Sequence, residues 1–99
     1  MHARVSTYVG SADHVEDAIR SFEEISAAVR ELDGFEGAYL LVDRGNGRAL
    51  TITLWSSEDA VQASTGRADQ TRAEAAATAG ISIESVEVYE VASQLSPPR

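Results

Sequence analysis

GFEGAYLLVDRGNGRALTITLW, residues 34–55, contains two apolar segments separated by a glycine-rich turn. Residues 38–42 form a continuous apolar run, and residues 48–55 place apolar residues at alternate positions. Between them, Gly45 and Gly47 flank Asn46 and supply the positive φ angles that a tight hairpin needs. We therefore expect residues 38–42 and 48–55 to form neighbouring antiparallel strands.

Two more strands are expected, one before this hairpin and one after it. Residues 3–9 combine β-branched and aromatic side chains and end at Gly10, which suits a first strand. Residues 81–91 alternate apolar and polar side chains, and the prolines behind them stop regular pairing. The sequence thus predicts one domain over residues 1–92 and a flexible C-terminal tail over residues 93–99.

The segment between the first two strands has the pattern of an amphipathic helix. Asp13 and Glu16 have the spacing of a capping box, and Gly34 can close the helix in the left-handed conformation. The apolar residues between them fall on one stripe of a helix: Val15, Ala18, Ile19, Phe22, Ile25, Val29 and Leu32.

A second helix is predicted over residues 58–79, which are rich in Ala and in helix-forming polar residues. Ser56 and Asp59 repeat the capping-box spacing, and Gly80 can end the helix. Its apolar face is thin, and Gly66 is expected to break or kink it. We therefore expect this helix to be weaker and more mobile than the first.

The order of elements is strand, helix, strand, strand, helix, strand. Right-handed crossovers then place both helices on one face of a four-stranded antiparallel sheet, which is the ferredoxin-like βαββαβ arrangement of the α+β class. The uncovered face is apolar too, because Tyr39 and Leu41 point away from Leu40, and Trp55 points away from Ile52. A second copy of the chain can cover that face, so we expect a homodimer formed through the sheet faces.

Composition excludes several classes of function. The 99-residue chain has 16 acidic and 8 basic residues and a net charge of −8, which disfavours binding to nucleic acid or to an anionic membrane. It has no Cys, no signal peptide and no apolar stretch that could span a membrane, so a cytoplasmic protein is expected. Its two His residues lack metal-ligand spacing, and no cofactor motif is present, so neither a metal nor a bound cofactor is expected.

Residues 34–60, GFEGAYLLVDRGNGRALTITLWSSEDA, and the closing VEVYEV resemble the antibiotic biosynthesis monooxygenase-like family within the dimeric α/β-barrel superfamily. The resemblance extends over residues 3–91. It implies a dimeric barrel with a pocket between sheet and helices in each subunit. In catalytic members an electron-rich aromatic substrate, or heme, occupies that pocket, and oxygen reacts without a separately bound flavin or metal.

The resemblance places the family's strand-end Trp at Trp55, and our candidate residues for the ligand pocket are Trp55, Phe22, Tyr8 and Thr7. Trp55 has two interpretations, a pocket wall for a planar ligand or a ring that fills the core. Candidate catalytic residues are Trp55, His14 and Tyr39. His14 is either a neutral base at the start of the first helix or an exposed first-turn residue, and Tyr39 is either catalytic or an interface residue. We set His2 aside as part of a frayed terminus.

Heme breakdown is disfavoured, because heme-degrading relatives carry an Asn on the first strand and a His on the second helix. Here the strand has Ser6 and Thr7, and residues 58–79 contain no His. Two hypotheses remain. The chain is an oxidoreductase, a cofactor-independent monooxygenase acting on a small aromatic or polyketide-like substrate, or it is a non-catalytic ligand-binding or structural dimer. An open cavity beside Trp55 would separate the two.

Overall fold

The computed structural model describes residues 1–64, 66, 73 and 82–97 of the chain. The strands in this part are β1 (His2–Val9), β2 (Phe35–Asp43), β3 (Arg48–Trp55) and β4 (Ser82–Glu90). A 3₁₀ turn, η1 (Ala12–His14), leads into helix α1 (Val15–Val29), and residues 58–64 are also helical. Most of the predicted second helix after residue 64, with Gly80 and Ile81, lies outside the described residues.

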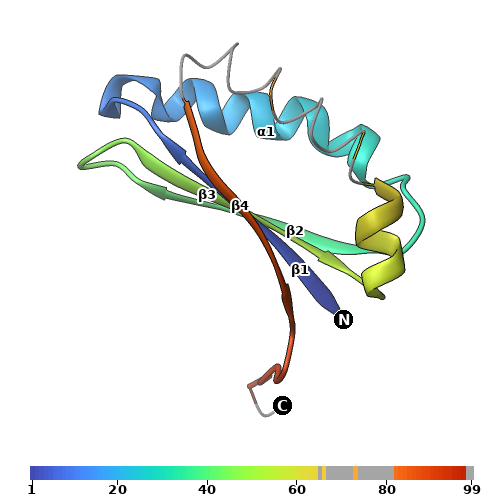
Figure 1. The fold of residues 1–99 in the computed structure, drawn as a ribbon. Coiled ribbons are helices and arrows are strands. Elements are labelled where there is room, and N and C mark those ends of the chain that lie inside the picture. The colour runs from blue at the N-terminus through green and yellow to red at the C-terminus, as the bar shows by residue number, and fades with distance from the viewer. Residues whose placement is uncertain (65, 67–72, 74–81, 98–99) are drawn as a thin grey trace.

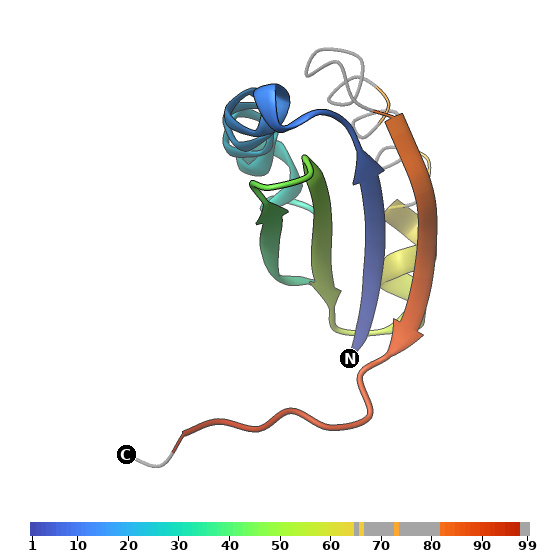
Figure 2. The same ribbon diagram turned by 90° about the vertical axis from the view of Figure 1, so that its left-hand side faces the viewer.

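The strands form one antiparallel sheet in the order β2-β3-β1-β4. Helix α1 and residues 58–64 lie on the same side of this sheet, as Figures 1 and 2 show. The predicted ferredoxin-like α+β fold is confirmed. The sheet therefore has a helix-facing side and an open side, and each side chain belongs to one of them.

The register assigns side chains to the two sides, because residues directly opposite each other in neighbouring antiparallel strands point the same way. Arg4 bonds to the helix at residues 58–64 and so marks the helix-facing side. On that side β1 and β3 place His2, Arg4, Ser6, Tyr8, Ala49, Thr51, Thr53 and Trp55, and β2 places Ala38, Leu40 and Val42. On the open side lie Val5, Thr7, Tyr39, Leu41, Leu50, Ile52, Leu54, Glu87 and Tyr89.

The two central strands, β1 and β3, have their larger aliphatic residues on the open side. Between Ala49 and Trp55, β3 turns only Thr51 and Thr53 towards the helices, and β1 adds Ser6. A layer packed against helices is ordinarily filled by the larger apolar residues. The core that does form on the helix-facing side centres on Tyr8 and Ala49, with Leu40 and Val42 packed against them.

Both helix starts differ from the predicted capping boxes. Asp13 lies inside η1, and no side chain caps the start of α1, because the 3₁₀ turn already occupies the predicted cap position. At the second helix, the cap is Ser57, whose Oγ accepts a hydrogen bond from Ala60 N at 3.1 Å. Ser56 N instead donates to Gly34 O at 2.8 Å, which keeps residue 56 aligned with the end of β3.

The glycines behave differently from one another. In the loop between β2 and β3 only Gly47 has a positive φ, of 75°. The Asp43 carboxylate accepts a hydrogen bond from Gly45 N and holds the first half of the loop in ordinary conformations. Gly34 has the predicted left-handed conformation, with φ of 81°, but α1 ends at Val29 with Arg30 as its cap, so Gly34 does not close the helix as predicted. Gly66 is helical, and its neighbours 65 and 67 lie outside the described residues, so the expected break or kink stays a prediction.

Strand β2 begins at Phe35, three residues earlier than predicted. A register shift between Phe35 and Gly37 lets Phe35 pair with Trp55 even though Glu36 interrupts the ladder. The bulge thus brings a second aromatic ring to the end of β3.

Candidate functional site

Trp55 lies at the end of β3 and has none of its surface exposed. The Phe35 ring meets it edge to face, with centroids 5.5 Å apart and an interplanar angle of 78°. The indole Nε1–H donates to Thr53 Oγ1 at 2.9 Å. With its edge against Phe35, its donor bonded and none of its surface exposed, the ring is packed as a core residue.

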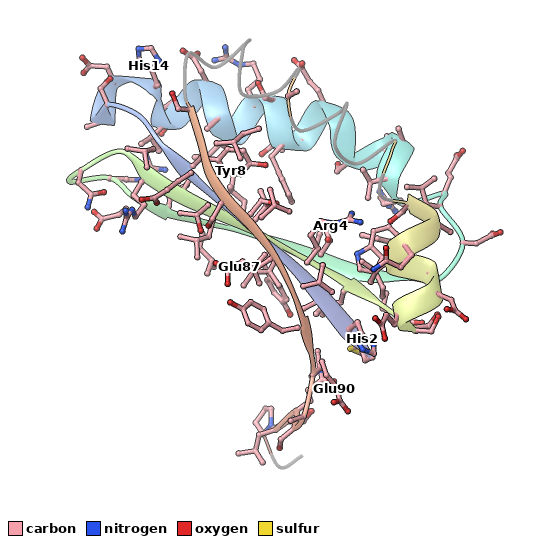
Figure 3. The ribbon with its side chains drawn as sticks, in the orientation of Figure 1. His2, Arg4, Tyr8, His14, Glu87 and Glu90 are labelled. Atoms are coloured by element: carbon pink, nitrogen blue, oxygen red, sulfur yellow. The ribbon has the colours of Figure 1, made fainter. Side chains whose placement is uncertain are left out.

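Arg4 covers the face of the same indole. Its Cζ lies 5.7 Å from the ring centroid, within the range of a cation–π contact, and the residue is only 4% exposed. Its Nη2 donates to Val61 O at 2.9 Å and to Ser64 Oγ at 3.3 Å. The guanidinium thereby joins Trp55 on the sheet to the helical residues 58–64, which are shown beside it in Figure 3.

The predicted pocket residues are not gathered around Trp55. Tyr8 shares the helix-facing side, but it pairs with Ala49, six residues along β3 from Trp55. At about 3.3 Å per residue, Tyr8 and Trp55 are roughly 20 Å apart along the strand. Thr7 lies on the open side. Phe22 lies on α1 and is half-buried.

The other predicted catalytic candidates lie away from Trp55 as well. Tyr39 is on the open side and is 59% exposed. His14 is half-buried at the residue that precedes α1, at the opposite end of the molecule from His2 in Figure 3. Neither residue shares the Trp55 environment.

His2 and Arg4 are the residues that sequence reasoning missed. His2 is not frayed but belongs to β1, where it pairs with Trp55 on one side and with Glu90 on the other. Its Nδ1 is buried and has no hydrogen-bond partner among the described residues. The signal was present in the sequence, because residues 2 and 4 alternate in step with Ser6 and Tyr8 and therefore share their side.

The open side carries the most exposed aromatic and aliphatic groups of the sheet. Tyr39, Leu41 and Tyr89 are 59%, 48% and 51% exposed. The Tyr89 hydroxyl donates a hydrogen bond to the Glu87 carboxylate, and this bond raises the pKa of Tyr89. This side of the chain therefore presents an apolar surface that also carries charged groups, among them Glu87 and the opposed pair Asp43 and Arg48.

The described residues were also compared with the requirements of a membrane-spanning helix and of a metal site. No helix within the described part of the chain is long and apolar enough to cross a membrane. Among residues 1–64, 66, 73 and 82–97, no three His, Asp or Glu side chains are grouped so that they could hold a metal ion. The cytoplasmic location expected from the sequence stays a prediction.

Three solved structures have the same fold over nearly their whole length. A monooxygenase from Streptomyces coelicolor, in complex with nanaomycin D, superposes with a TM-score of 0.77 at 15% identity, covering 98% of this chain and 92% of its own. SnoaB, a cofactor-independent oxygenase from Streptomyces nogalater, gives a TM-score of 0.69 at 18% identity, with 97% of each chain covered. The heme-degrader MhuD from Mycobacterium tuberculosis gives a TM-score of 0.73 at 22% identity, and the match covers 97% of this chain and 100% of MhuD.

Comparison with curated protein sequences found no relative of this chain. The sequence model of the antibiotic biosynthesis monooxygenase family, in contrast, matches residues 1–76. That match spans β1 to β3 and the described helical residues, and it agrees with the fold of the three structures. The chain therefore belongs to the antibiotic biosynthesis monooxygenase family.

Proposed function

We propose that this protein is an oxygenase without a bound cofactor, which oxidises a small hydroxylated aromatic or polyketide-like molecule with O₂. Family membership supports an oxygenase. Two structures with the same fold are described as a cofactor-independent oxygenase and as a monooxygenase holding nanaomycin D. The substrate is placed between the middle of the helix-facing side and α1.

The observation that carries this placement is the small size of the central side chains under the helices. Ser6 and Thr51 face each other across β1 and β3 where a packed core would hold larger apolar groups, and of the two Ser6 is buried while Thr51 is half-buried. Thr51, Leu40 and Phe22 remain only half-buried although α1 covers this side. Half-buried apolar groups beside hydroxyls are the surroundings that an aromatic ligand with polar substituents prefers.

The chemistry requires a substrate that loses a proton to become an electron-rich anion. For a hydroxylated anthrone, one O₂ converts the methylene carbon to a carbonyl, with one oxygen atom entering the product and the other leaving as water. This four-electron oxidation balances without any further reductant. The protein has to bind the ring, favour the anion and keep bulk water away.

Dithranol, a tricyclic hydroxyanthrone, tests this function. We expect the protein, dialysed against EDTA, to consume O₂ and form the quinone in equal amounts, faster than the buffer blank. Thr51→Leu fills the space between sheet and helix and should lower kcat/KM about tenfold or more. Ala27→Leu adds side-chain volume at an exposed position of α1, away from both sides of the sheet, and should change kcat/KM less than twofold. No acceleration over the blank by the unaltered protein would refute the proposal.

A non-catalytic, ligand-binding or structural dimer is the second candidate, and the packing of Trp55 favours it. The ring that the family resemblance places at the pocket wall is fully enclosed, and its N–H is already bonded to Thr53. Binding of nanaomycin D without oxygen consumption from dithranol is the result expected for this candidate.

We also propose that the functional unit is a homodimer joined through the open sides of two sheets. The apolar groups that α1 and residues 58–64 do not cover support this, since a monomer would leave Tyr39, Leu41 and Tyr89 in water.

Leu41→Arg is expected to convert the dimer to a monomer, because an interface that buries this position cannot solvate the charge. Sedimentation velocity or light scattering should show the mass halved. Gln62→Arg introduces the same charge at an exposed helical position and should leave the mass unchanged. An unaltered mass for soluble Leu41→Arg protein would count against a dimer formed through this face.

A further inference from the structure

The chain continues beyond β4 as a segment that does not join the sheet. Residues 92–97, which we call the C-terminal arm, are all exposed and form neither helix nor strand. Val91 N donates to Met1 O at 2.9 Å, so the arm begins beside the first residue of β1's end of the sheet. From there it leaves on the side of the sheet opposite to α1 in Figure 1, and in Figure 2 it runs from below β4 to beyond β2.

The arm carries a large apolar side chain into solvent on the open side. Leu95 is 95% exposed, the highest value among the large hydrophobic residues that the structure describes. The other residues of the arm are Ala92, Ser93, Gln94, Ser96 and Pro97, and none of the six is charged. The arm can therefore lie against an apolar surface without leaving a charge unpaired.

The arm is long enough to cross from one subunit to another. Six drawn-out residues reach about 20 Å beyond the end of β4. Two sheets packed face to face are about 10 Å apart. In a dimer joined through the open sides, the arm of one subunit thus extends to the level of the partner's sheet.

The two edges of the sheet differ in how well they are protected against pairing. β4 forms one edge, and its sequence SIESVEVYE contains three Glu residues. β2 forms the other edge, and its sequence FEGAYLLVD has acidic residues only at its second and last positions. Charged residues along an edge strand oppose the addition of another strand. The middle of β2 lacks them, so β2 is the edge that can accept a strand.

The arm has the features of a strand that could be added there. An edge strand turns the N–H and C=O groups of every second residue outward, and an extended segment can pair with them. Each residue from 92 to 96 has a backbone N–H, and Pro97 ends the run. On the open side of β2, Tyr39 and Leu41 are 59% and 48% exposed and offer an apolar surface for Leu95.

We infer that the C-terminal arm of each subunit pairs with the outer edge of the partner's β2, with Leu95 against the open side of that strand. In a free monomer the arm remains the flexible tail that the sequence predicts for residues 93–99. The inference rests on the proposed homodimer. It adds the segment that each copy contributes and the edge that receives it.

Photochemical cross-linking locates the arm. The chain has no Cys, so Leu95→Cys provides one thiol, to which a benzophenone is attached. Irradiation should give a covalent dimer on a denaturing gel, and mass spectrometry should place the link in residues 35–43 of the other subunit. The same label on Gln62→Cys, at an exposed helical position, should leave monomers. Adding Leu41→Arg to the labelled Leu95→Cys protein should abolish the covalent dimer.

The affinity of the dimer measures the contribution of Leu95. Leu95→Ser should raise the dissociation constant of the dimer about tenfold or more, because each dimer loses two apolar contacts. Gln94→Ser is the matched control, since neighbouring residues of an added strand point to opposite sides, and it should change the constant less than about threefold. Sedimentation of each variant over a dilution series gives these values.

The inference is overturned if a dimeric protein labelled at position 95 yields no covalent dimer, or if the link lies outside residues 35–43 of the partner. Equal dissociation constants for Leu95→Ser and Gln94→Ser would also overturn it. These results leave the homodimer itself intact, whereas an unaltered chain that sediments as a monomer at every concentration refutes the homodimer and the arm's role together. Neither measurement depends on oxidation of dithranol, so the oxygenase function is tested separately.

Discussion

Gly47→Ala is expected to lower the free energy of unfolding by about 2 to 5 kcal/mol, because the substitution combines a strained backbone with a steric clash. Gly47 has φ of 75°, a conformation that residues with a Cβ adopt only at a cost. An added Cβ would also lie 2.3 Å from Ser11 C and 2.5 Å from Gly10 O. Both neighbours are backbone atoms of the segment between β1 and α1, so neither can rotate aside.

Urea denaturation followed by circular dichroism measures this change. Gly45→Ala is the matched control, two residues earlier in the same loop. Its φ is not positive, and its added Cβ would meet only the Asp43 carboxylate, at 3.3 Å. The free energy of unfolding of Gly45→Ala should fall by less than about 1 kcal/mol. Similar losses for the two variants would mean that the hairpin tip does not pack against the loop before α1 in solution.

Trp55→Ala is expected to lower the free energy of unfolding by about 3 to 5 kcal/mol, the range for removing a fully buried aromatic side chain. The substitution leaves a cavity under residues 61–64, deprives Thr53 of a donor and removes the surface on which Arg4 lies. Against a total stability of about 5 to 15 kcal/mol, that loss could unfold the domain at physiological temperature. Tyr39→Ala, which removes a ring that is 59% exposed, should cost far less in the monomer.

Trp55→Phe then separates the two interpretations of this residue. If the ring mainly fills the core, the variant should lose about 1 to 3 kcal/mol of stability while nanaomycin D binds with unchanged affinity. If the ring serves as a pocket wall, binding or turnover should weaken while the melting temperature stays close to that of the unaltered protein. A variant that changes neither property would leave no role for the indole in this protein.

The sequence predicted the elements well, because each depends on local patterns. The hairpin followed from Gly-Asn-Gly between two apolar runs, and α1 followed from a stripe with helical spacing. The boundaries were less accurate. Asp13 and Ser56 have the right chemistry for helix caps, but a 3₁₀ turn and the bond from Ser56 N to Gly34 O shift both helix starts.

The candidate site was predicted less well. Trp55 was identified from its place at the end of a strand, but Tyr8 proved to be six residues away along the paired strands, and Thr7 lies on the other side of the sheet. Arg4 and His2 were missed, because their alternation with Ser6 and Tyr8 shows that the four residues share one side of the strand but not that this side is buried.

The sequence by itself determined the strands, the first helix, the alternation of side chains within each strand and the membership of a family. Tertiary structure alone decided which side of the sheet the helices cover, and that Arg4 lies between the indole of Trp55 and the turn at residues 61–64. The physical reason is that periodicity specifies only relative orientation within one element. The side that becomes buried, and the residues that meet there, depend on strand register and on contacts between segments far apart in the chain, such as Arg4 and Val61, which are 57 positions apart.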